Sequence, residues 1–257
     1  MTKWEQIIKG IRFQTDSSQK IGIECDLCQD IGWIRQPGER YEQIEPCICT
    51  VKKQNERMLA NSGIAEAFKS KRLDEYQGTT PEAVKAKKAA ASFLEKFHET
   101  ESQESNSIGF FGQVGSGKTH LTVAVANELM EKGVQVRCMQ YRPAIDQIKR
   151  NRMDEVYYHK QTMPFKNCRV LLIDDLFKGA VRNGELNQSD LQIIFDLIDH
   201  RYLNKKPMII SSEFYPDKIM ALDGAIGGRI VEMCRMHTVQ FKDPASNHRL
   251  KGIRVVR

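Results

Sequence analysis

The sequence lacks long hydrophobic runs. Its longest apolar runs, such as VLLI at residues 170–173, are far too short to span a bilayer. The amino-terminal segment MTKWEQIIKGIRFQ also lacks the continuous apolar core of a secretory signal peptide. Both absences argue against a membrane or secreted protein and predict a cytoplasmic one. In that reducing compartment, clustered cysteines bind metal ions more often than they form disulfides.

Internal repeats are also lacking, and so are low-complexity tracts beyond the short polar loop at residues 99–107. Charge is unevenly distributed. Residues 1–107 carry 16 Lys or Arg and 17 Asp or Glu, whereas residues 108–257 carry 23 and 16. The basic surplus of the second part is compatible with an acidic partner, nucleic acid first, and equally with a well-solvated basic surface.

Apolar strand segments alternate with amphipathic helical segments after residue 107. We expect strands at residues 108–111, 134–139, 169–176 and 207–213. We expect helices at residues 3–14, 50–62, 80–98 and 118–132, within 143–163, and at 189–206. Thr80 and Ser189 are the expected N-caps of two of these helices. The alternation predicts an α/β fold with a mostly parallel sheet covered on both faces.

A glycine-rich loop joins the first of these strands to the following helix. Its sequence, GQVGSGKTH at residues 112–120, contains the P-loop pattern GxxxxGK[ST]. Glycines let successive backbone N–H groups point at phosphate oxygens, and the helix N-terminus adds partial positive charge. Lys118 is expected to reach the β- and γ-phosphates of ATP, and the Thr119 hydroxyl to bind Mg²⁺. The predicted ATP-binding residues of the loop are Gly112, Gly115, Gly117, Lys118, Thr119 and His120.

Two adjacent acids follow the apolar segment VLLI. They come at the carboxyl end of a predicted strand, where open α/β sheets bind their ligands. We expect Asp174 to hold the Mg²⁺ shell and Asp175 to orient or deprotonate the attacking water. The sequence therefore predicts an ATPase that converts ATP and water to ADP and phosphate, with weak turnover in the absence of DNA or a partner.

Four cysteines lie close together ahead of the P-loop. Cys25 and Cys28 form one pair, Cys47 and Cys49 form a second, and 18 residues separate the pairs. Two close pairs of thiolates can supply the tetrahedral ligands of Zn²⁺ without a large core, and no histidine in this region competes with them. We therefore predict a structural zinc site, with free surface thiols and an iron–sulfur cluster as the alternatives.

Together with IFDLIDHRY at residues 194–202 and GGRIVEMC at residues 227–234, these motifs resemble a known family. They are similar to the bacterial and phage DnaC-type helicase loaders and to the IstB-type transposition ATPases of the AAA+ superfamily. The resemblance covers residues 20–257 and implies an AAA+ ATPase domain with a parallel five-stranded sheet at residues 108–257. It further implies an N-terminal zinc-binding, helicase-interacting region at residues 1–62, a linker and helix at 63–107, and no separate C-terminal lid.

The resemblance also implies roles for single residues. Arg229 is expected to be the arginine finger that completes the ATP site of a neighbouring subunit in an ATP-bound homo-oligomer. Relatives often carry Asn at the end of the strand MIISS, where this chain has Glu213. Tyr76 or Leu73 is expected to pack near the base. Arg201 is interpreted as a solvated helix-face residue, with a place at the subunit interface as the alternative.

Basic residues are concentrated between the second and third predicted strands. Residues 142–169 hold seven Lys or Arg against three acids, with Tyr157 and Tyr158 among them. Basic side chains neutralise phosphates, and aromatic rings stack on exposed bases. The resemblance places helices that contact single-stranded DNA here, and the alternative is an amphipathic helix with core tyrosines. The predicted DNA contacts are Lys149, Arg150 and Arg152, with Lys178 and Arg182 in the next loop as further candidates.

These features support three functional hypotheses. The first is an ATP-dependent DNA replication protein that loads the replicative DNA helicase onto single-stranded DNA, with ATP acting as a switch. The alternative is an IstB-like ATPase that regulates a transposase on duplex DNA. The third, suggested by Glu213, is a binding module whose ATPase is silent.

Overall fold

The structure is a computed structural model that describes residues 23–37, 41–60, 66 and 70–248. The chain divides into two compact units, Met1–Cys47 and Ile48–Arg257. In the first unit, strands β1 (Trp33–Gln36) and β2 (Gln43–Pro46) pair as an antiparallel hairpin. The helix expected at residues 3–14 lies outside the described residues.

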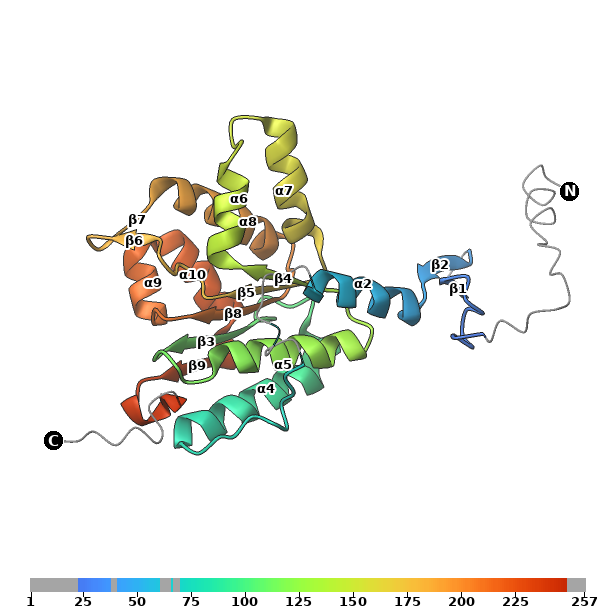
Figure 1. Ribbon diagram of the computed structural model, residues 1–257, viewed down its shortest axis with the longest axis horizontal. Coiled ribbons are helices and arrows are strands. Elements are labelled where there is room, and N and C mark those ends of the chain that lie inside the picture. Colours follow the sequence, from blue (N-terminus) through green and yellow to red (C-terminus); the bar gives the residue numbers. More distant parts are fainter. Residues whose placement is uncertain (1–22, 38–40, 61–65, 67–69, 249–257) are drawn as a thin grey trace, which may run out of the picture. The chain divides into compact units, whose positions relative to one another are not determined.

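A five-stranded sheet forms the centre of the second unit (Figure 1). Neighbouring strands are all parallel. Three of them, β3, β5 and β8, are buried along their whole length, as expected for a parallel sheet covered on both faces. The predicted α/β fold with a parallel five-stranded sheet is confirmed. The spatial order is β4 (Val136–Gln140), β5 (Val170–Asp174), β8 (Met208–Ser212), β3 (Ile108–Gly112) and β9 (Thr238–Phe241).

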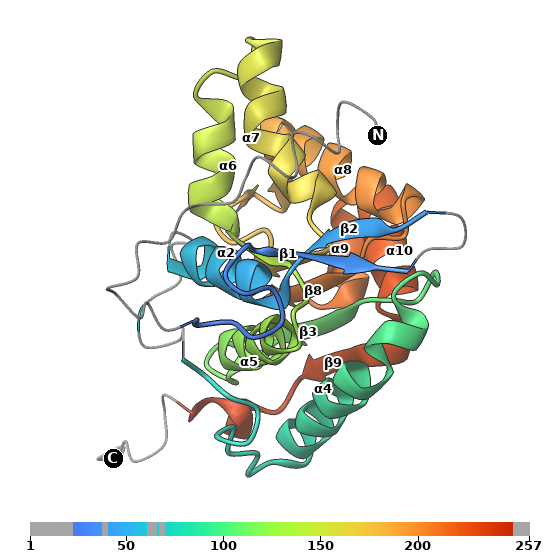
Figure 2. The same ribbon diagram turned by 90° about the vertical axis from the view of Figure 1, so that its right-hand side faces the viewer.

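Helices cover both faces of this sheet (Figures 1 and 2). On one face, α4 (Pro81–Thr100) and α5 (Lys118–Glu131) share an apolar cluster with strand residues such as Phe110 and Leu172. On the other face, Phe111 and Leu171 belong to a second cluster. Successive strand residues point to opposite faces, so neighbours in the sequence supply different clusters. The second cluster is covered by α6 (Tyr141–Lys149), α8 (Gln188–Leu203), α9 (Pro216–Leu222) and α10 (Gly224–Met233).

Smaller elements complete the second unit. Helix α7 (Glu155–Asn167) follows α6 and packs on α8, and the short strands β6 (Val181–Arg182) and β7 (Glu185–Leu186) form a hairpin after β5. Helix α2 (Ile48–Ala60) contacts β4. The buried Asn55 side chain donates to the Val134 carbonyl and accepts from the Val136 N–H, so it satisfies main-chain groups beside the edge strand.

One of the two predicted N-caps is confirmed, and the other is wrong. Thr80 caps α4 as predicted, because its hydroxyl accepts from the Ala83 N–H at 3.2 Å. Ser189 is not the cap of α8. Asn187 takes this place, since its side-chain oxygen accepts from the N–H groups of both Ser189 and Asp190.

After β9, the chain passes through the 3-10 turn η2 (Pro244–Ser246) to residue 248, the last residue that the structure describes. Among the residues that the structure describes, we find no helix with the length and apolar character needed to traverse a membrane.

Candidate functional site

The loop between β3 and α5 requires glycine for two physical reasons. Gly112, Gly115 and Gly117 have positive φ angles of 99°, 76° and 85°, which other residues rarely adopt. A Cβ atom at Gly115 would lie 2.1 Å from Asn247 Oδ1, and one at Gly117 would lie 2.7 Å from the Tyr76 ring. The loop therefore has both the backbone conformation and the close packing that the P-loop pattern predicts.

Lys118, at the start of α5, turns its ammonium group back into this loop. Its Nζ donates to the carbonyl oxygens of Gly112 and Gln113, both at 2.7 Å. Burial lowers the pKa of Lys118 to about 8, and the carboxylates of Glu213 and Asp175 act in the opposite direction. A buried ammonium group beside a glycine loop fits a polyphosphate, because an anion would replace the hydration that burial removes.

Thr119 and Asp174 lie together, although 55 residues separate them in the sequence. The Thr119 hydroxyl donates to Asp174 Oδ1 at 3.1 Å, and the Ser211 hydroxyl donates to the same oxygen at 2.6 Å. Burial raises the pKa of the Asp174 carboxyl, and the bond from Ser211 opposes this shift. A hydroxyl next to a carboxylate offers the hard oxygen ligands that Mg²⁺ prefers, so these residues fit the predicted metal.

Asp175 begins a tight turn at the end of β5. Its φ angle is 57°, and its N–H donates to the Ser211 hydroxyl at 2.8 Å. Its Oδ2 atom lies 2.6 Å from Lys178 Nζ, which is also 3.4 Å from Glu213 Oε1. Asp175, Lys178 and Glu213 therefore form a charged cluster at the carboxyl end of the sheet.

The P-loop and this charged cluster line one pocket of about 420 Å³. Tyr76 and His248 also line it. The Tyr76 hydroxyl donates to the Ser116 carbonyl at 3.0 Å, and its ring meets that of His120 edge to face at 5.4 Å. Tyr76 thus lines the pocket beside the predicted phosphate site, whereas Leu73, which belongs to the same buried apolar cluster, does not.

Sequence reasoning missed several lining residues, including Lys71 and His248. The His248 N–H donates to the Gly115 carbonyl at 2.9 Å, which brings the segment after β9 onto the P-loop. Glu82, at the start of α4, accepts from the main-chain N–H groups of residues 242 and 243. No motif signals these contacts, since the tertiary fold alone brings residue 248 to residue 115.

The four predicted metal ligands come together. The sulfur atoms of Cys25, Cys28, Cys47 and Cys49 all lie within 4.8 Å of one another, and those of Cys25 and Cys47 are 3.7 Å apart. In a tetrahedral site with Zn–S bonds of about 2.3 Å, sulfur atoms are roughly 3.8 Å apart. The Gly32 N–H donates to Cys28 Sγ at 3.3 Å. The donor set and its spacing fit Zn²⁺.

Arg229, the predicted arginine finger, lies within α10. Its guanidinium group is 2.7 Å from Asp199 Oδ1, donates to the Ala225 carbonyl, and lies over the rings of Phe195 and Tyr202. Its side chain is 26% exposed. Arg229 does not line the P-loop pocket of its own chain, so a catalytic role for it would have to be exerted on another subunit.

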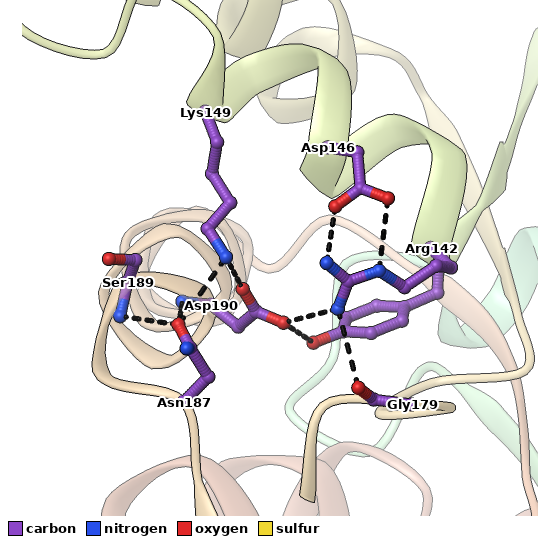
Figure 3. Close-up of polar contacts among 8 residues, drawn as sticks. Arg142, Asp146, Lys149, Gly179, Asn187, Ser189 and Asp190 are labelled. Atoms are coloured by element: carbon purple, nitrogen blue, oxygen red, sulfur yellow. Dashed lines mark hydrogen bonds and ion pairs between the residues drawn. The ribbon is translucent and has the colours of Figure 1, made fainter.

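Lys149, one of the three predicted DNA contacts, is engaged within the domain (Figure 3). Its ammonium group pairs with the carboxylate of Asp190, which is fully buried, and lies 3.3 Å from Asn187 Oδ1. Arg142 contacts the same carboxylate at 3.0 Å, and the Tyr141 hydroxyl lies 3.4 Å from it. Lys149 therefore links α6 to the start of α8.

The other two predicted DNA contacts differ from Lys149. Arg150 is exposed, and Arg152 donates to the Gln192 side chain. The neighbouring tyrosines are half-buried: the Tyr157 hydroxyl donates to the Gln147 carbonyl, and the Tyr158 hydroxyl donates to Asp196 Oδ2. Tyr157 thus links α7 to α6, and Tyr158 links α7 to α8. Arg150 is the most open of the three predicted cations.

Our interpretation of Arg201 as a solvated residue is wrong, and so is its alternative place at a subunit interface. Its side chain is fully buried in α8, and burial lowers the pKa of its guanidinium group. The guanidinium donates to five carbonyl oxygens, whose main-chain groups lie at the end of α7, in the turn before β5 and just before β8. A helix-face pattern could not reveal this, because the acceptors are backbone atoms of distant segments. The acceptors are Phe165, Lys166, Cys168, Arg169 and Pro207.

Comparisons with known proteins agree with this geometry. The model of a family described as "IstB-like ATP binding protein" matches residues 51–245. The phage-like element PBSX protein XkdC of Bacillus subtilis (strain 168) is 34% identical over 249 residues, which cover 94% of this chain and 90% of the relative. The solved structure of the DnaC helicase loader has a TM-score of 0.59 at 24% identity, covering 69% of this chain and 100% of that chain. The structure of DnaI has a TM-score of 0.54 at 18% identity, covering 71% and 93%.

Proposed function

Because this chain belongs to the family of IstB-like ATP binding proteins, we propose that it is an ATP-dependent replication protein. In this proposal it loads a replicative DNA helicase onto single-stranded DNA. The likeness of its fold to a helicase loader supports the choice of partner. The observation that carries the proposal is that Lys118 and Thr119 line one pocket and that Thr119 is hydrogen-bonded to Asp174, because these groups suit a metal-bound triphosphate.

Each group in the pocket has a separate task in this proposal. The main-chain N–H groups of the glycine loop and the Lys118 ammonium group bind the phosphates. Thr119 and Asp174 would hold Mg²⁺, which when bound neutralises charge on the β- and γ-phosphates. Asp175 orients the attacking water and accepts its proton. The γ-phosphate then acts as the switch: its presence holds one assembly state with the helicase, and its loss on hydrolysis gives the released state.

Arg229 acts between subunits in this proposal. It does not line its own pocket, so it contributes if two copies of the chain assemble around ATP. Asp199 and the rings of Phe195 and Tyr202 hold its guanidinium group on the surface of α10. The proposal therefore includes a homo-oligomer that forms with ATP, and it assigns Arg229 to turnover rather than to nucleotide binding.

The cysteine-rich region, residues 1–62, is proposed to bind the helicase. A zinc site gives a short segment a fixed shape without a large apolar core. Four sulfur atoms within 4.8 Å of one another support one Zn²⁺ per chain. Elemental analysis of protein purified without added metal measures this ratio, and a value near zero in folded protein would exclude the metal.

The function is tested by a loading assay on circular single-stranded DNA. The candidate helicase retained on the circle is measured with and without this protein and Mg-ATP. We expect retention to depend on both, and we expect Lys118→Ala to abolish ATP binding and retention. Lys85→Ala, which removes an exposed lysine of α4, is the matched control. Full retention with Lys118→Ala would contradict the proposal.

The family model itself supports a second candidate, an IstB-like ATPase that regulates a transposase on duplex DNA. The two candidates predict different partners. Co-purification of this protein in the presence of Mg-ATP with a candidate helicase and a candidate transposase, offered together, distinguishes them. Recovery of the transposase and preference for duplex over single-stranded DNA would favour the second function.

A further inference from the structure

Lys178 is a cation in the pocket that the P-loop motif does not account for. It follows β5 by four residues, in a turn where Asp175 and Phe177 have φ angles of 57° and 66°. Such angles are uncommon for residues other than glycine, and they cluster at functional sites. The turn is closed by a bond from the Lys178 N–H to the Asp175 carbonyl at 3.0 Å. The backbone thereby directs the Lys178 side chain back toward the end of β5.

Two carboxylates hold the Lys178 ammonium group at the pocket. Its Nζ lies 2.6 Å from Asp175 Oδ2 and 3.4 Å from Glu213 Oε1. The Lys178 side chain is 52% exposed, so its charge is not enclosed by the protein. These three residues and Lys118 all line the same pocket. Lys178 therefore has charge and space to contact a ligand that occupies it.

We propose that Lys178 is a further catalytic residue, which binds the γ-phosphate of ATP from within the same subunit. This inference rests on the proposed ATPase function. When the triphosphate is bound, Lys178 moves its hydrogen bond from Asp175 to a γ-phosphate oxygen. Glu213 is a positioning residue, because it keeps the ammonium group at the pocket during this exchange.

The charges of the pocket give the physical reason. A triphosphate that enters beside Asp175 and Glu213 meets two carboxylates of its own sign, and like charges at such distances repel. The carboxylate of Glu213 accepts hydrogen bonds and cannot donate one to a phosphate oxygen. An ammonium group held between the two acids removes the repulsion and supplies the donor.

The same movement prepares the chemical step. Once Lys178 leaves Asp175, this carboxylate is free to accept a proton from the attacking water. The water oxygen forms a bond to the γ-phosphorus as the bond from that phosphorus to the bridging oxygen breaks. The bridging oxygen leaves with ADP, and the proton passes from Asp175 to the released phosphate or to solvent. Lys178 stabilises the charge on the γ-phosphate oxygens during this transfer.

The experiment compares a nucleotide that has the γ-phosphate with one that lacks it. The dissociation constants of Mg-ADP and of a non-hydrolysable Mg-ATP analogue are measured by calorimetry, together with steady-state hydrolysis. For Lys178→Met we expect about a tenfold or greater loss of affinity for the analogue, the range for one charge-assisted hydrogen bond. Affinity for ADP should change by less than about twofold, and Lys178→Arg should recover much of the loss. Lys218→Met, at an exposed position of helix α9, is the matched control.

Glu213→Gln provides a second and independent measurement. We expect a smaller loss of affinity for the analogue than with Lys178→Met, and we expect the two losses not to add in the double variant, because both act through one contact. A loss of affinity for ADP of the same size, or independent additive effects, would assign Glu213 a structural role and overturn its part of the inference.

The remaining outcomes distinguish failure of the Lys178 inference from failure of the proposed function. If the natural protein binds the analogue and Lys178→Met binds it equally well, the inference fails and the proposed function stands. Faster hydrolysis by Lys178→Met would also overturn it, because Lys178 would then block the site rather than serve it. If the natural protein, folded by circular dichroism, binds neither nucleotide, the proposed function itself fails.

Discussion

Two aspartates of the second unit, Asp190 and Asp175, each contact lysine yet differ in their surroundings. Asp190 is fully buried, and its carboxylate contacts Arg142, Lys149 and the Tyr141 hydroxyl (Figure 3). Asp175 is 25% exposed, contacts Lys178, and lines an open pocket.

The difference shows how burial separates a structural charge from a functional one. A buried carboxylate must be satisfied by protein groups, and once satisfied it fixes the elements that carry those groups. Asp190 in this way joins α6 to α8. A carboxylate beside a pocket keeps hydrogen-bonding capacity for a ligand, and its ion pair to an exposed lysine contributes little to stability. Asp175 in this way remains available for chemistry.

The largest effect on stability is expected at Arg201, because its charge, like that of Asp190, is enclosed by the protein. We expect Arg201→Met to lower the free energy of unfolding by about 3 kcal/mol, because five carbonyl groups each lose a charged donor. Urea denaturation measures the change. Arg150→Met removes an exposed arginine and serves as the control. Equal stability of the two variants would contradict the expected difference between a buried and an exposed charge.

Asp190→Ala should have the next largest effect. We expect a loss of about 2 kcal/mol in the free energy of unfolding, since Arg142 and Lys149 keep their charges and lose the carboxylate they share. Asp146→Ala is a close control, because Asp146 also pairs with Arg142 but is 49% exposed. Its expected loss is below about 0.5 kcal/mol. A larger loss for Asp146→Ala would contradict the role of burial.

A smaller effect is expected on DNA binding, where an exposed cation should contribute more than one that is paired within the domain. Arg150 is exposed, whereas Lys149 is committed to Asp190. We expect Arg150→Met to weaken binding to single-stranded DNA by about threefold and to reduce its salt dependence, as for one phosphate contact. Lys149→Met should change affinity less. Fluorescence anisotropy at several salt concentrations distinguishes the two, and the reverse order would assign the contact to Lys149.

The smallest effect on stability is expected at Asp175. We expect Asp175→Asn to change the free energy of unfolding by less than about 0.5 kcal/mol, because its ion pair is partly exposed. Hydrolysis of ATP should fall by about 100-fold or more, the range for loss of a general base. Thermal denaturation and a phosphate-release assay measure the two quantities. A loss of stability near that of Asp190→Ala would remove the distinction between the two aspartates.

Local patterns predicted much of the fold. Alternation of apolar strands with amphipathic helices indicated the parallel sheet, and Thr80 marked the start of α4 correctly. The cap of α8 was misplaced by two residues, because both Asn187 and Ser189 are good N-caps and the sequence does not rank them. Arg201 was misinterpreted because its acceptors are main-chain carbonyls, which leave no signature in the sequence.

The sequence by itself determined which chemical groups this protein has: a glycine loop with Lys118 and Thr119, two acids after an apolar strand, and two pairs of cysteines. These choices are local, because each depends on backbone conformation or spacing over a few residues. The tertiary structure alone decided which charges are enclosed and which face a pocket. Burial depends on elements that are distant in the sequence, so Asp190 and Asp175 became different only when the sheet and its helices packed around them.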